Sequence, residues 1–121
     1  NAKAGPAHLW EHAVLTLGDE TSLLGALARS DVLINATPVG TRDSASSPLS
    51  AEQLAALPAH AFVFDLIYTP PETRLLRLAR ARGLAGCGGL DMLLYQGAAA
   101  FTLWTGLPAP LEVMRQALVL A

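Results

Sequence analysis

The sequence predicts an α/β fold, in which part of a parallel sheet carries flanking helices and the C-terminus is helical. Its segments alternate between short continuous apolar runs and stretches with helical periodicity, which is the pattern of βα units. Hydrophobic residues make up 52% of the chain and charged residues 15%, a balance typical of a chain that buries both faces of a sheet. The 121 residues are enough for about one domain with a single core.

The first half is expected to contain a helix, a strand and a second short helix. Leucines and alanine recur at helical spacing over residues 21–29, and residues 31–35 (DVLIN) form a continuous apolar run typical of a buried parallel strand. A turn-rich loop follows over residues 36–47. Ser50 and Gln53 then form a capping-box pattern for a short helix that reaches Leu57.

The second half continues the same alternation and ends in two helices. Residues 61–65 (AFVFD) predict a second buried strand, and residues 84–87 a weaker third one. Between them, Thr69 and Glu72 form a capping-box pattern for a helix over residues 72–82 that ends at Gly83. Two features close the chain: a helix over residues 90–104 that is apolar nearly all round, which we expect to be buried on most sides, and a last helix that starts near Pro110.

Composition argues against several classes of partner. The formal net charge is −2 and the eight basic residues are scattered, so we expect no nucleic-acid partner. The longest apolar run, residues 92–107, is interrupted by polar residues and is shorter than the roughly 20 residues of a membrane span, so we expect no membrane segment. His8, Glu11 and His12 have helical spacing but lack a third ligand, so we expect no metal site.

The ends and the hydropathy of the chain indicate that it works within something larger. It begins at Asn1 with no secretory signal pattern, and we expect it to start inside a longer protein. A mean hydropathy of +0.39 indicates apolar surface that meets another domain or a second subunit, so a homodimer stays open. The single cysteine, Cys87, forms no internal disulfide and fits a reducing cytoplasm.

Three loops are predicted to meet at one edge of the sheet. They follow the three strands and comprise residues 35–40 (NATPVG), 65–68 (DLIY) and 88–92 (GGLDM). Parallel sheets bind ligands in the crevice outside the carboxyl ends of their strands. We therefore expect the binding site at the junction of these loops.

In this order and spacing, the motifs NATP-x-G, DLIY-x-P-x-x-T, GGL-x-ML-x-x-QG and FxLWTG resemble the C-terminal part of the shikimate dehydrogenase family. The resemblance covers about residues 31–118. It implies an NADPH-dependent, reversible reduction of 3-dehydroshikimate to shikimate by the full-length protein. It also implies that the chain is the C-terminal portion of a Rossmann-like, dinucleotide-binding domain, with residues 90–121 packing toward an N-terminal substrate domain outside this chain.

The resemblance also implies roles for seven residues. Substrate would be bound by the hydroxyl of Tyr68 and the side chain of Gln96. Contacts on the cofactor side would come from the loops and the start of the following helix: Leu66, Gly89, Met92, Asn35 and Thr37. Simpler alternatives stay open: a loop tyrosine satisfied by backbone, a glutamine bonded to a neighbouring loop, a turn glycine, and an asparagine that ends its strand by bonding the next loop.

No catalytic residue is expected in this chain. In the family the resemblance points to, a lysine and an aspartate of the first domain handle the hydroxyl proton, whereas Lys3 is the only lysine here and no family motif surrounds it. A glycine-rich phosphate loop is also absent from the sequence, so NAD is not excluded beside NADP. We expect the chain alone to be inactive. The alternatives are a non-catalytic binding or sensor module and a quinate/shikimate dehydrogenase that uses NAD.

Overall fold

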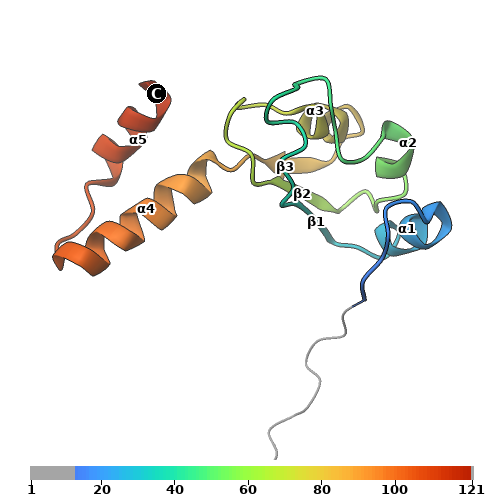
Figure 1. Cartoon of the computed structure of the whole chain (residues 1–121), viewed down its shortest axis with the longest axis horizontal. Coiled ribbons are helices and arrows are strands. Elements are labelled where there is room, and N and C mark those ends of the chain that lie inside the picture. Colours follow the sequence, from blue (N-terminus) through green and yellow to red (C-terminus); the bar gives the residue numbers. More distant parts are fainter. Residues whose placement is uncertain (1–12, 121) are drawn as a thin grey trace, which may run out of the picture.

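The computed structural model describes residues 13–120 and has the predicted α/β architecture, with a three-stranded parallel sheet in the order β1-β2-β3 (Figure 1). Along the described chain the elements are α1 (Glu20–Leu27), β1 (Val32–Asn35), α2 (Ala51–Leu54), β2 (Phe62–Asp65), α3 (Arg74–Ala81), β3 (Ala85–Cys87), α4 (Leu90–Thr105) and α5 (Leu111–Leu120). Each predicted helix and strand is present, with ends that differ by a few residues.

The helices that pack on the sheet cover one of its faces. Because side chains alternate along a strand, Leu33 and Val63 point to one side and Val32, Ile34 and Phe62 to the other. The first side joins a core with the apolar residues of α1, α2 and α3. On the second side Val32 and Ile34 remain 54% and 55% exposed. The expectation that both faces are buried is therefore wrong for the described residues.

Two predicted helix ends are confirmed. At α2 the hydroxyl of Ser50 accepts a hydrogen bond from the backbone N–H of Gln53 at 3.1 Å, and the Gln53 side chain returns one to the Ser50 N–H at 3.0 Å. At the end of α3, Gly83 adopts a φ of +80°, a conformation that side-chain-bearing residues rarely take.

The predicted start of α3 is wrong. Thr73 is the N-cap, and its hydroxyl accepts a hydrogen bond from the N–H of Leu76 at 3.3 Å. The reason is tertiary: the same hydroxyl donates to the buried carboxylate of Asp65 at 2.6 Å, which holds Thr73 at the helix start. Glu72 pairs with Arg80 instead of forming a capping box with Thr69.

Helices α4 and α5 form a hairpin that extends away from the sheet (Figure 1). Gly106, with a φ of +70°, ends α4, and Arg115 of α5 binds Asp91 of α4 at 2.6 Å. The expected burial of α4 on most sides is wrong for the described residues, since Leu103 and Trp104 are 82% and 81% exposed. None of the helices in residues 13–120 is long and apolar enough to cross a membrane.

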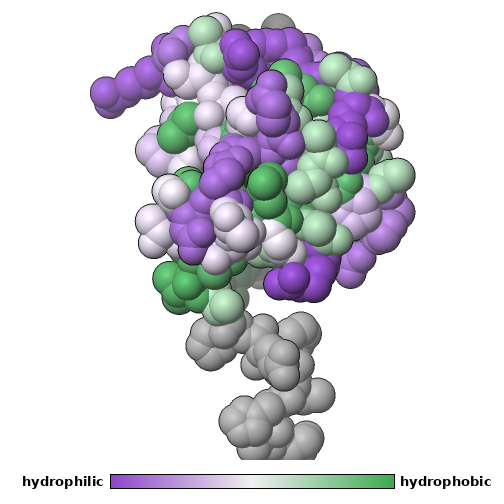
Figure 2. Space-filling view, turned by 90° about the vertical axis from the view of Figure 1, so that its right-hand side faces the viewer, coloured by the Kyte–Doolittle hydropathy of each residue, from purple (hydrophilic) through white to green (hydrophobic). Residues whose placement is uncertain are grey.

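The opposite end of the molecule has a mixed surface. Figure 2 views it from the side on which α1 and α2 lie, and hydrophobic side chains are scattered there among hydrophilic ones.

Candidate functional site

The three loops that follow the strands meet at the carboxyl edge of the sheet, as predicted. Hydrogen bonding continues past the strand ends: the N–H of Leu66 donates to the carbonyl oxygen of Asn35 at 3.0 Å, and the N–H of Gly89 donates to that of Ile67 at 2.9 Å. The first loop is tied to the second, and the second to the third. This edge is the candidate site.

Gly89 is in close contact with Leu66. A Cβ atom at position 89 would lie 2.1 Å from the carbonyl oxygen of Leu66, a distance that no real contact reaches. A side chain is therefore excluded where the third loop crosses the second. Leu66 and Gly89, both expected on the cofactor side, thus lie directly against each other, and Gly89 is also the N-cap of α4.

Asp65 lies at the centre of the edge, and the sequence did not single it out. Its carboxylate is fully buried and accepts hydrogen bonds from the Asn35 amide at 3.0 Å, the Ile67 N–H at 3.1 Å and the Thr73 hydroxyl at 2.6 Å. The signal that could have identified it is its position, because a charged residue that ends an apolar strand needs several donors when it is buried.

The side chain of Asn35 forms its hydrogen bonds within the protein. It is buried, its amide donates to Asp65, and its side-chain oxygen accepts from both the N–H and the hydroxyl of Thr37, at 3.0 and 2.7 Å. This geometry supports the simpler interpretation that Asn35 ends its strand by bonding the next loop. Thr37 is exposed. Contact of either residue with a cofactor stays a prediction.

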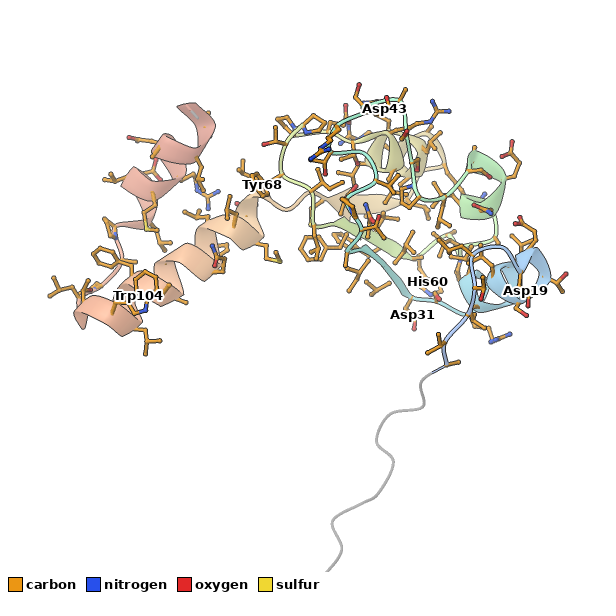
Figure 3. The ribbon with its side chains drawn as sticks, in the orientation of Figure 1. Asp19, Asp31, Asp43, His60, Tyr68 and Trp104 are labelled. Carbon is orange, nitrogen blue, oxygen red and sulfur yellow. The ribbon has the colours of Figure 1, made fainter. Side chains whose placement is uncertain are left out.

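Tyr68, Met92 and Gln96 present accessible side chains. Tyr68 is 48% exposed and lies between the sheet and the start of α4 (Figure 3). Met92 is also exposed, and the amide of Gln96 reaches only the Leu93 carbonyl of its own helix, at 3.1 Å. Since α4 rises about 1.5 Å per residue, Gln96 lies roughly 10 Å beyond Gly89 along the helix. If the predicted residues form one site, it would extend from the sheet edge onto α4.

The charged groups around the edge serve mainly structural contacts. Arg77 of α3 donates to the Ser44 carbonyl at 2.8 Å and fastens the loop between β1 and α2. In that loop, hydrogen bonds from the Ser46 hydroxyl and the Ala45 N–H lower the pKa of Asp43. The pair between His60 and Asp31, 2.8 Å apart, lies at the other end of the strands and outside the site (Figure 3).

Residues 13–120 contain no cluster of three or more His, Cys, Asp or Glu side chains that could hold a metal ion. The segment with His8, Glu11 and His12 lies outside the described residues, as does Lys3. What the edge offers chemically is a tyrosine hydroxyl, a glutamine amide and backbone carbonyls. These groups can donate and accept hydrogen bonds to a polar ligand.

The chain matches known proteins over most of its length. The family model for the shikimate 5'-dehydrogenase C-terminal domain matches residues 89–119. The NADP(+) shikimate dehydrogenase of Thermosynechococcus vestitus is 53% identical over 93 residues, which are 76% of this chain and 32% of that protein. The chain thus spans about a third of the length of the curated relatives it matches.

Solved structures agree with this match. A Thermus thermophilus shikimate 5-dehydrogenase in complex with NADP(H) and shikimate is 44% identical, with a TM-score of 0.69 over 78% of this chain and 35% of that one. A quinate dehydrogenase from Corynebacterium glutamicum in complex with NAD is 30% identical, with a TM-score of 0.73 over 84% of this chain and 35% of that one. In sequence and fold the chain belongs to the shikimate dehydrogenase family, and it corresponds to about the C-terminal third of those proteins.

Proposed function

We propose that the chain is the C-terminal part of an NADP-dependent shikimate dehydrogenase, which reversibly reduces 3-dehydroshikimate to shikimate. The observation that carries the proposal is the 44% identity and shared fold with a structure that holds NADP(H) and shikimate. Since the matched segment makes up only 35% of that structure, the reaction belongs to the full-length protein, and the chain alone is expected to be inactive. We also propose a cytoplasmic location, which fits a protein segment with a single, unpaired cysteine.

The accessible groups of the site divide between cofactor and substrate. Bound nicotinamide supplies the hydride chemistry. The carbonyl of Gly89 and the side chain of Leu66 are proposed to hold its ring at the sheet edge, with Met92 at the start of α4 beside it. Tyr68 and Gln96 are proposed to bind the carboxylate and hydroxyl groups of the substrate. Asn35 and Thr37 shape the loop on the cofactor's ribose side.

The uncovered surfaces support the assignment as one portion of a larger dinucleotide-binding domain. In the described residues β1 pairs with β2 alone, and the exposed face of the sheet carries Val32, Ile34 and Phe62. An apolar face and a free strand edge are covered in stable proteins. We propose that the N-terminal remainder of the protein covers them and that the α4–α5 hairpin packs toward its substrate domain. In the alternative, a second copy of the protein covers these surfaces in a homodimer.

Two alternative functions can be separated from the proposed one by experiment. The resemblance to the NAD-bound quinate dehydrogenase favours a quinate/shikimate enzyme that uses NAD. A non-catalytic binding or sensor module would retain the fold without turnover. Assays of the full-length protein with shikimate or quinate, each with NADP⁺ or NAD⁺, separate the three. Turnover of shikimate with NADP⁺ supports our proposal, preference for quinate and NAD⁺ supports the second, and no turnover in any combination contradicts both enzymes.

Two variants test the substrate contacts in the full-length protein. Tyr68→Phe and Gln96→Ala each remove one hydrogen bond, so kcat/KM for shikimate should fall by about tenfold, which corresponds to roughly 1.4 kcal/mol. Tyr95→Phe and Gln116→Ala make the same chemical changes at exposed positions on α4 and α5, outside the site loops. They should leave kcat/KM unchanged. Equal kinetics in all four variants would remove Tyr68 and Gln96 from the site.

A further inference from the structure

A hydrogen-bond network centred on Asp65 joins four separate segments of the chain. Its carboxylate accepts three hydrogen bonds. The donors are the side-chain amide of Asn35 at the end of β1, the backbone N–H of Ile67 in the second site loop and the hydroxyl of Thr73 at the start of α3. The side-chain oxygen of Asn35 in turn accepts hydrogen bonds from the N–H and the hydroxyl of Thr37 in the first loop. Gly89, at the start of α4, bonds the carbonyl oxygen of Ile67.

The network is well satisfied and is therefore hard to rearrange. Asp65, Asn35 and Thr73 are all buried, and every buried side-chain nitrogen and oxygen in the described part of the chain has a partner. None of the ion pairs among the described residues involves Asp65, so hydrogen bonds alone compensate its burial. Removing a partner from a buried carboxylate is costly because no water replaces the lost donor. The loops are thereby confined to one relative arrangement.

We propose that Asp65 is a positioning residue for the dehydrogenase reaction, acting through Ile67 and Asn35 to hold the first and second site loops in one arrangement relative to each other. The inference rests on the proposed function for its kinetic consequence. Asp65 is buried, so it acts through the neighbouring loop residues and not by touching the ligands. Hydride transfer is sensitive to displacements of about 1 Å between the reacting groups, so a loosened network should lower kcat.

The sharpest test changes Thr73 in the full-length protein, because this residue lies eight positions beyond Asp65 and outside the site loops. Thr73→Val removes the hydroxyl with little change of shape, whereas Thr73→Ser keeps it. We expect kcat at saturating shikimate and NADP⁺ to fall about tenfold or more in Thr73→Val and to return to within about twofold of wild type in Thr73→Ser. Asp65→Asn should lower kcat at least as much.

A matched control separates positioning from loss of stability. Ser50→Ala also removes an N-cap hydroxyl, but from α2, where that hydroxyl accepts from the Gln53 N–H and is not among the donors to Asp65. It should leave kcat unchanged when assayed well below the unfolding temperature. If Thr73→Val behaves like Ser50→Ala, or if Thr73→Ser fails to restore kcat, the positioning role is refuted.

Amide hydrogen exchange gives a readout that needs no activity. The N–H groups of Thr37 and Ile67 are bonded by Asn35 and Asp65, so both should exchange faster in Thr73→Val and Asp65→Asn, while the β2 amides stay protected. Unchanged exchange at both positions would overturn the network. If the wild-type protein shows no turnover, the proposed function fails, whereas faster exchange at Thr37 and Ile67 would still support the coupling of the loops.

Discussion

Replacing Gly89 by alanine should damage both the stability and the activity of the full-length protein. The added Cβ would lie 2.1 Å from the carbonyl oxygen of Leu66 and 2.6 Å from its carbonyl carbon, where ordinary contacts begin at about 3.4 Å. Both of these Leu66 atoms belong to the backbone, so no flexible side chain can yield. Either the second loop or the start of α4 must shift by roughly 1 Å, which also strains the hydrogen bond from Gly89 to Ile67.

The size of the effect follows from that shift. Overpacking a close contact costs about 1–3 kcal/mol of unfolding free energy. A displacement of this size between reacting groups lowers kcat by up to about a hundredfold. Urea unfolding followed by circular dichroism measures the first quantity, and NADPH formation from shikimate and NADP⁺ measures the second.

Gly97→Ala provides the matched control. Its new Cβ would lie 3.4 Å from the terminal methyl group of Met114, the flexible end of a side chain. Alanine in place of glycine inside a helix should stabilise by up to about 1 kcal/mol. Two results together would refute the argument that the two loops need close backbone contact. They are an unfolding free energy of Gly89→Ala equal to that of Gly97→Ala and a kcat of Gly89→Ala equal to that of the wild type.

Further predictions concern the caps, the charges and the uncovered surface. Ser50→Ala should lower the unfolding free energy by about 1 kcal/mol in urea titrations, because α2 loses its cap; no change would contradict the capping box. The coupling between Asp91 and Arg115 should be small and should vanish in high salt, as measured by a double-mutant cycle, since both side chains are largely exposed. The pKa of Asp43 is lowered in the folded protein, so its contribution to stability is present above the ordinary carboxyl pKa and is lost as pH falls through the folded value; an NMR titration that finds an ordinary pKa would refute this. Leu103→Asp should destabilise the full-length protein by more than the roughly 0.5 kcal/mol typical of exposed sites if another domain covers the hairpin, and thermal unfolding will decide.

Much of the fold was predictable because local chemistry determined it. The α2 capping box needs only Ser50 and Gln53, three residues apart, and the stop after α3 needs only the backbone freedom of Gly83. The apolar runs that became strands are short and continuous, and their parallel order brings their ends to one edge. The meeting of three loops at that edge could be inferred from topology alone.

Contacts between distant segments could not be inferred in this way. Thr73 became the cap of α3 in place of Thr69 because its hydroxyl also binds Asp65, eight residues earlier in the chain. Asn35 turned inward for the same reason. The close contact of Gly89 with Leu66 depends on how the third loop crosses the second, which glycine content does not reveal.

The sequence by itself determined the order of helices and strands, the meeting of three loops at the carboxyl edge and the family resemblance, because these depend on residue patterns that act locally. Only the tertiary structure decided which polar side chains are used inside the protein and which remain accessible to a ligand. It also showed that α4 is apolar yet exposed in the described part of the chain. The physical reason is that burial depends on which segments pack together, and hydrophobicity specifies that a surface should be covered without specifying what covers it.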